Sequence, residues 1–336
     1  MTLGDVRDKS KPEVRIDIDT NGTTCLAALS ALTNLRPEAS FHEVLDSRHP
    51  LGIYNVSVSR LSDKMRKCCG KVESYCKASA SLAELQRHHA ALRREVIDYL
   101  ELSVYAAAEH VDDAKAIASC FFKTENQFTK SPAVRLLKTD LKTARDKISS
   151  FANLIKHRQS RIRIFSVEFT HDSVPLCLHA LFAEEFSQGA VRPSPLLHSG
   201  SQRLISITGF LWDLVLFIIA SSAALSRFLH TMSAVQGNAS EGVPSQEMAE
   251  AIIALARLPL YSFDEIHPFA KTRVVVSCAG AVVPRLDSGL YGTFAHRWTK
   301  STDGRVGRFA GEYEGDGVTK TFQIVVPENL NLQHWE

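Results

Sequence analysis

Apolar residues recur at three- and four-residue steps through the middle of the chain. They begin at Leu82 and continue to Phe121, with polar residues in the gaps between them. This spacing puts the apolar side chains on one face of a helix, as is typical of a helix that packs on a protein core. A helix of that length would be about 60 Å long.

A second helical pattern follows after a break at 123–131. Pro132 stands at its start, where a proline favours the first helical turn, and the apolar positions then run from Leu136 to Ile155. Two helices joined by a short link pack antiparallel. The sequence therefore predicts a mainly α-helical protein built on a long antiparallel helical hairpin or bundle.

The period changes from helical to alternating after residue 160. Residues 162–170 alternate as a strand does, and 175–186 is either its hairpin partner or a second extended piece. Alternation at Val14, Ile16 and Ile18 suggests an edge strand, and valine runs with Gly- and Asp-rich turns after Lys271 predict a small antiparallel β region. We expect an N-terminal segment (1–55), a helical bundle domain (56–260) with a β-hairpin insertion near 161–186, and a small C-terminal β region (271–336).

Composition places the chain among ordinary globular proteins. Its 336 residues are 45% hydrophobic and 23% charged, which argues against global disorder. Lys and Arg total 39 against 37 Asp and Glu, so the net charge is only +2. Any nucleic-acid site would therefore have to be a local patch.

Cellular location can be inferred from two features of the sequence. The seven cysteines are odd in number and lack paired short spacings, which favours reduced thiols and the cytoplasm. The N-terminus has no apolar core of a signal peptide. Residues 205–229 are long and apolar enough to span a membrane, but Asp213 near the middle would be costly there, so a helix buried inside the bundle is expected.

A polar cluster lies at the end of the second predicted helix. Asn153, Lys156 and His157 stand at i, i+3 and i+4, so they project from one face within about one turn. Arg158 and Arg161 follow. An imidazole can move protons at neutral pH, and cations beside it can hold a phosphate, which are the roles that metal-independent RNA cleavage requires.

The segment Phe151-Ala-Asn-Leu-Ile-Lys-His157-Arg resembles the Asn-x-x-Lys-His signature of certain HEPN-like helical proteins. The resemblance covers about residues 59–163 and includes the acids Glu109, Asp112 and Asp113 on the preceding helix. It implies a helical bundle that forms a homodimer, with a ribonuclease site built from both protomers, often in toxins or anti-phage defence.

Within that resemblance, the site would need no metal or other cofactor. His157 would be the acid or base, Asn153 would orient the scissile group, and Lys156, with the phosphate-binding residues Arg158 and Arg161, would stabilise charge on the phosphate. The partner would be RNA or another phosphate-bearing ligand.

The acids on the preceding helix have a different expected role. Antiparallel counting places Glu109 nearer Arg145 than His157. The acids are therefore expected to pair with Lys142 and Arg145, and to reach His157 only through a shifted register or from another chain.

The same residues have interpretations that involve no catalysis. Amides and cations at a helix C-terminus also satisfy free carbonyl groups and compensate the helix dipole. The cluster could bind phosphate or a nucleotide without cleaving anything. A protein of a different class, a non-enzymatic helical scaffold whose C-terminal β region binds a partner protein, also fits the sequence.

Overall fold

A computed structural model of the chain describes most of the helical region and parts of the β regions. The described residues are 13–78, 90–157, 160–171, 174–187, 190–198, 205–236, 243–258, 261–262, 273–279, 281–282, 305–308, 321–324 and 331–332.

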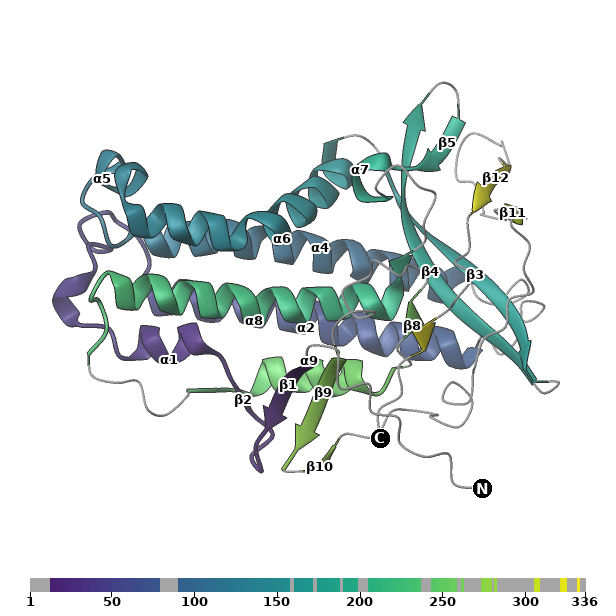
Figure 1. Cartoon of the computed structure of the whole chain (residues 1–336), viewed down its shortest axis with the longest axis horizontal. Coiled ribbons are helices and arrows are strands. Elements are labelled where there is room, and N and C mark those ends of the chain that lie inside the picture. Colours follow the sequence, from purple (N-terminus) through teal and green to yellow (C-terminus); the bar gives the residue numbers. More distant parts are fainter. Residues whose placement is uncertain are drawn as a thin grey trace.

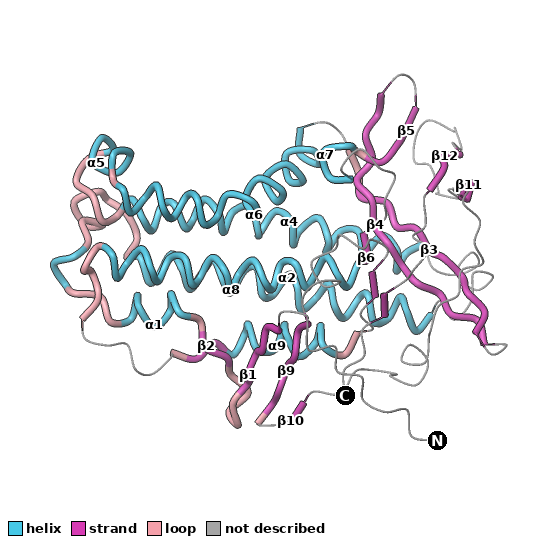
Figure 2. Tube along the Cα trace, in the orientation of Figure 1, coloured by secondary structure: helices cyan, strands magenta, loops and turns pink. Residues whose placement is uncertain are grey.

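The protein is mainly α-helical, as predicted. Four long helices lie side by side, and shorter helices and small sheets cover their ends and one side (Figures 1 and 2). The helices are α1 (Ala27–Thr33), α2 (Pro50–Ala78), α4 (Ala90–Ser119), α5 (Glu125–Lys130), α6 (Pro132–His157), α7 (Pro195–His198), α8 (Ile207–Thr231) and α9 (Gln246–Ala256), with a 3-10 turn at Pro37–Ala39.

The predicted hairpin consists of α4 and α6, which pack against each other. Part of the first predicted helix, 82–89, lies outside the described residues. The break between the two helices contains the short helix α5, which begins after Thr124 because the Thr124 hydroxyl accepts a hydrogen bond from the backbone N–H of Gln127. Pro132 is the first residue of α6. Most of α2 falls within the predicted helical bundle domain (56–260), but the predicted hairpin did not include this helix, which packs along α4.

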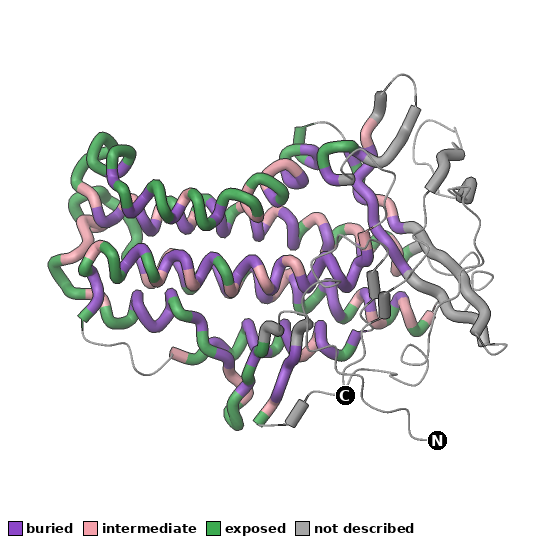
Figure 3. Tube along the Cα trace, viewed as in Figure 1, coloured by how far each residue is buried: buried purple, intermediate pink, exposed green. Residues whose placement is uncertain are grey.

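The most apolar helix, α8, lies inside the bundle. Its mean hydropathy of 1.8 over an 18-residue window would suit a membrane span, but 72% of that window is buried against the rest of the protein. Figure 3 shows this helix as mostly buried. The carboxylate of Asp213 reaches the edge of α6, where it lies 3.5 Å from the Lys147 ammonium. These observations support the expected buried helix.

The strand predicted after residue 160 is β3 (Ile162–His171), and its antiparallel hairpin partner is β4 (Val174–Ser187). The alternation sets which face meets the core, because Ile162 and Ile164 are both buried. Two further short strands pair with β4: β5 (Ala190–Pro193) and β6 (Ile205–Ser206). The hairpin crosses the end of the bundle at which α6 terminates (Figure 1).

Small sheets also form near both ends of the chain. Strand β9 (Arg273–Cys278) pairs antiparallel with β10 (Ala281–Val282), and β11 (Arg305–Arg308) pairs antiparallel with β12 (Thr321–Ile324), which confirms small antiparallel sheets in the C-terminal region. The alternating N-terminal residues form the edge strand β1 (Glu13–Ile18), as expected. Unexpectedly, β1 pairs parallel with β9. The remaining short antiparallel pairs are β2 (Thr24–Cys25) with β7 (Pro244–Ser245) and β8 (Tyr261–Ser262) with β13 (Asn331–Leu332).

A histidine is buried at the centre of the helical core. The ring nitrogens of His110 on α4 lie 2.8 Å from the Ser57 hydroxyl of α2 and 2.9 Å from the Ser221 hydroxyl of α8. Phe217 packs edge-on against the ring. Burial lowers the pKa of His110 to about 4, because the charged imidazolium would lose its hydration there. His110 is therefore neutral at physiological pH and joins three helices through hydrogen bonds.

Candidate functional site: the C-terminal end of α6

The last turns of α6 separate apolar from polar side chains. Phe151, Leu154 and Ile155 are buried, and the Phe151 ring packs 5.5 Å from that of Phe210 on α8. Because these residues hold one face of α6 against the core, the opposite face points to solvent. Asn153, Lys156 and His157 lie on that opposite face and are exposed.

Lys156 is in contact with an aromatic residue of the neighbouring helix. Its ammonium nitrogen lies 4.8 Å from the centre of the Tyr105 ring on α4, a cation–π contact. Tyr105 is partly buried, and this burial, together with the nearby Glu101 carboxylate, raises the pKa of its phenol. The phenol therefore stays protonated at neutral pH. The contact places the Lys156 ammonium group over the Tyr105 ring, at the junction of α6 and α4.

Glu101, one turn before Tyr105 on α4, is a partly buried acid at this end of the bundle. Its carboxylate accepts a hydrogen bond from the backbone N–H of Ile162, where β3 begins. Partial burial raises the pKa of Glu101, and Asp98 adds to that rise, while the Ile162 hydrogen bond and the Arg161 charge oppose it. A carboxyl group with a raised pKa beside cations is a common feature of functional sites and also of structural ion networks.

Sequence reasoning missed Glu101 and Tyr105, although a signal for Glu101 was available in the sequence. The antiparallel register that places Glu109 opposite Arg145 also places Glu101 opposite Asn153 when it is continued by two turns. The same register places Tyr105 opposite Ser149, so it gives no signal for a contact with Lys156. The structure brings Tyr105 to Lys156 and Glu101 to the electrostatic range of Arg161.

The predicted pairing of the other acids with Lys142 and Arg145 is wrong for Glu109 and Asp112. Glu109 forms an ion pair with Arg60, because α2 packs along α4 and carries that arginine to it. Asp112 pairs with Lys115 on its own helix at 2.9 Å. Arg145 pairs instead with Asp146 at 2.7 Å. Asp113 is partly buried on α4.

Of the two predicted phosphate-binding arginines, Arg161 lies within the described residues. Arg161 is exposed and immediately precedes β3, so the strand holds its backbone near the end of α6. Arg158 lies outside the described residues. The described site therefore consists of Asn153, Lys156 and His157 on α6, Arg161 before β3, and Glu101 and Tyr105 on α4.

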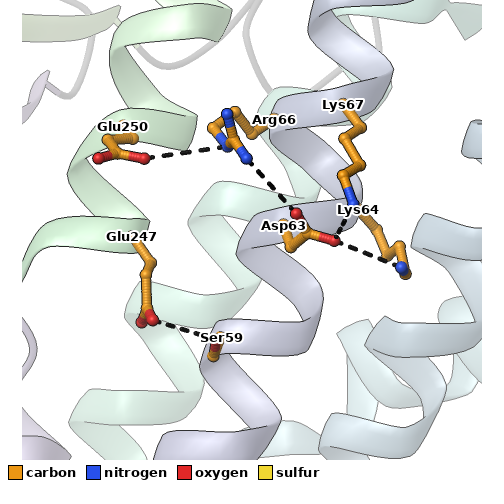
Figure 4. A network of polar contacts seen from close by, with 7 residues as sticks. All are labelled: Ser59, Asp63, Lys64, Arg66, Lys67, Glu247 and Glu250. Carbon is orange, nitrogen blue, oxygen red and sulfur yellow. Dashed lines mark hydrogen bonds and ion pairs between the residues drawn. The ribbon is translucent and has the colours of Figure 1, made fainter.

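A second polar region joins α2 and α9 on the other side of the bundle from α6 (Figures 1 and 4). Asp63 contacts Lys64, Arg66 and Lys67 on its own helix. Two contacts cross to α9: the Ser59 hydroxyl donates to Glu247 at 3.2 Å, and the Arg66 guanidinium lies 3.9 Å from Glu250.

A broad groove of about 880 Å³ lies beside this region, between α2 and residues 243–247. Its charged lining residues all contact neighbouring side chains of the protein: Arg60 contacts Glu109, Lys64 contacts Asp63, and Glu247 contacts Ser59. The contacts of Arg60 and Glu247 link α2 to neighbouring helices, and the contact of Lys64 lies within α2.

Within the described residues, no three His, Cys, Asp or Glu side chains are grouped as metal ligands. Cys68 and Cys69, which are close to Cys76 in sequence, are buried in the core, and burial raises the pKa of both thiols. Comparison with known proteins adds no assignment: no family model, no curated protein and no solved structure matches this chain.

Proposed function

We propose that the end of α6 binds a phosphate group of RNA and that His157 acts there as a general acid or base in metal-independent strand cleavage, in a HEPN-like protein of the cytoplasm. The observation that carries this proposal is the exposure of His157 together with Asn153 and Lys156 on a single helical turn. An imidazole bonded inside the core, as that of His110 is, would have no access to a ligand.

The chemistry needs a proton acceptor, a proton donor and positive charge. In cleavage, the RNA 2′-oxygen forms a bond to phosphorus as its proton passes to a base, and the bond from phosphorus to the 5′-oxygen breaks as that oxygen receives a proton from an acid. Lys156 and Arg161 supply positive charge for the phosphate, and the Asn153 amide supplies hydrogen bonds. His157 performs one of the two proton transfers.

The second proton-transfer group would come from a second copy of the chain. A homodimer that brings two α6 ends together would place two imidazoles at one phosphate, so that one acts as base while the other acts as acid. Because that arrangement requires association, the protein should be a dimer at the concentrations at which it is active. Light scattering after size-exclusion chromatography measures this, and a strict monomer that cleaves RNA would contradict the two-chain site.

The test of catalysis is the substitution His157→Ala, with labelled single-stranded RNA in the presence of a chelator. We expect wild-type protein to produce fragments that end in a cyclic phosphate, and the variant to lose at least about a hundredfold in rate, as expected when a general acid or base is removed. His230→Ala is the matched control, because His230 is also exposed and lies in the last turn of a long helix. It should cleave at the wild-type rate.

The runner-up functions predict different results in the same experiment. RNA binding without cleavage by wild-type protein would identify a phosphate-binding protein that is not an enzyme. If wild-type protein neither binds nor cleaves RNA and His157→Ala only lowers the melting temperature, His157 is a structural residue. A scaffold role with a protein partner would then be the better interpretation.

A further inference from the structure

The solvent side of α6 carries a row of cations that the proposed site does not fully use. The helix holds six Lys or Arg residues against two Asp, whereas the whole chain has a net charge of only +2. At 3.6 residues per turn, five of the six fall within about 80° of the helix circumference. We call these five the basic stripe: Arg135, Lys138, Lys142, Arg145 and Lys156.

All five residues of the basic stripe are exposed or partly exposed, and Figure 3 shows exposed residues recurring along α6. Asn153 falls at the edge of the same 80°, and His157 lies about 40° beyond that edge. From Arg135 to Lys156 the stripe is about 32 Å long at standard helical rise. It therefore ends at the proposed site.

The other charged residues of α6 mostly point elsewhere. Asp140 pairs with Arg227 of α8 at 2.8 Å, and Lys147 pairs with Asp213 of α8 at 3.5 Å. These two residues thus join α6 to the core helix, on the side away from the stripe. Only Asp146 contacts a stripe residue among the ion pairs of the described chain, through Arg145. The helix itself leaves most of the stripe's positive charge uncompensated.

The middle of the stripe borders a small hollow between α4 and α6. Lys138 and Arg145 line it together with Lys115 of α4, and its floor is apolar, with Val111 and Leu141 among the lining residues. The Lys138 ammonium lies 5.1 Å from the centre of the Phe128 ring, and both side chains line the hollow. Cations around an apolar floor suit a ligand that alternates charged and less polar groups.

We infer that the basic stripe binds the phosphate backbone of single-stranded RNA and leads the strand to His157. A row of cations one helix wide, with an apolar hollow beside it, matches a single strand, whose backbone follows a line of positive charge while its bases contact less polar surface. This inference deepens the proposed function and rests on it only for where the strand is cut. Binding along the stripe is measurable whether or not cleavage occurs.

The experiment compares two charge-matched triple variants of the full-length protein. The stripe variant carries Lys138→Gln, Lys142→Gln and Arg145→Gln. The control variant carries Lys64→Gln, Lys67→Gln and Lys77→Gln on α2, so it loses the same charge from a different helix. Fluorescence anisotropy measures binding of a labelled mixed-sequence RNA long enough to span the stripe, at several salt concentrations, and circular dichroism checks that each variant is folded.

We expect the stripe variant to bind this RNA about tenfold more weakly or worse, with the control variant close to wild type. Each phosphate neutralised on a single strand contributes about 0.7 to the slope of log affinity against log salt, so the slope should fall by about two in the stripe variant only. Equal binding by wild type and stripe variant would overturn the inference. So would an equal loss in both variants, because overall charge would then explain it.

Two further measurements separate this inference from the proposed function. If RNA binds and its binding depends on the basic stripe, but no RNA is cleaved, the inference about the stripe is supported and the proposed cleavage is contradicted. If the stripe variant cleaves both the long RNA and a dinucleotide at the wild-type rate, the proposed function stands. The inference that the basic stripe guides RNA to His157 is then overturned. Sedimentation with anionic phospholipid vesicles tests the other polyanion: stripe-dependent sedimentation with vesicles, in a protein that does not bind RNA, would also overturn the inference.

Discussion

The ammonium nitrogen of Lys156 lies 4.8 Å from the centre of the Tyr105 ring. This contact links the last turn of α6 to α4 and keeps a cation beside His157. An exposed cation–π contact contributes about 0.5–1 kcal/mol, so its main effect is on where the lysine lies and less on whether the protein folds.

Tyr105→Leu removes the ring beneath Lys156 while keeping an apolar side chain of moderate size. We expect RNA affinity to fall by about two- to fivefold, with a small change in melting temperature, because only the position of one cation is lost. Tyr105→Phe keeps the ring and should bind like wild type. Anisotropy titrations of the three proteins test this, and equal weakening by Phe and Leu would instead assign the effect to the phenol hydroxyl.

Glu101→Gln should change how stability depends on pH. The folded protein raises the pKa of Glu101, so the folded state holds this proton more tightly than the unfolded state. The resulting stabilisation is present below the unfolded pKa and is lost as pH rises through the folded value. The variant, which keeps an oxygen for the Ile162 N–H, should therefore gain stability relative to wild type between pH 4 and pH 7. Urea unfolding of both proteins at pH 4 and pH 7 measures the difference in their unfolding free energies. If the stability of Glu101→Gln relative to wild type fell toward pH 7, the raised pKa of Glu101 would be contradicted.

His110 should make the protein sensitive to mild acid. Its pKa is about 4 in the folded protein against 6.5 for the ordinary side chain, so the unfolded state binds the proton first as pH falls. The neutral buried ring contributes its stabilisation fully above pH 6.5, and about 3 kcal/mol of it is lost by pH 4.

The measurement is urea unfolding of wild type and His110→Gln from pH 7 to pH 4. The variant should be less stable at pH 7, because at least one of the Ser57 and Ser221 hydrogen bonds is weakened, but the gap should narrow as pH falls. Because buried His179 also has a lowered pKa, of about 3, the comparison with the variant isolates the part due to His110. If the difference in unfolding free energy between wild type and His110→Gln did not change with pH, the lowered pKa of His110 would be contradicted.

Glu109→Gln should leave RNA cleavage at the wild-type rate. The Glu109 carboxylate pairs with Arg60 of α2, and both side chains are exposed by more than 40%, so the pair contributes less than about 1 kcal/mol to stability. Cleavage assays and thermal melts measure the two effects. A large loss of cleavage with an unchanged melting temperature would show that Glu109 takes part in the site, for example from the other protomer of a dimer.

The helical pattern was readable from the sequence where one face of a helix packs on the core. The apolar spacing predicted α4 and α6, and Pro132 marked the start of α6. The alternation after residue 160 predicted β3, because a strand with one buried face must alternate. For the site, the spacing of Asn153, Lys156 and His157 implied that they share a face, and the structure exposes that face.

What the sequence did not predict involves partners that are distant along the chain. The parallel pairing of β1 with β9, the ion pair of Glu109 with Arg60, and the placement of Tyr105 under Lys156 each depend on which elements become neighbours. A local pattern determines which face of an element is buried, because the period of the helix or strand is built into the backbone. Which other element covers that face depends on the packing of the whole core, and only the tertiary structure decided it.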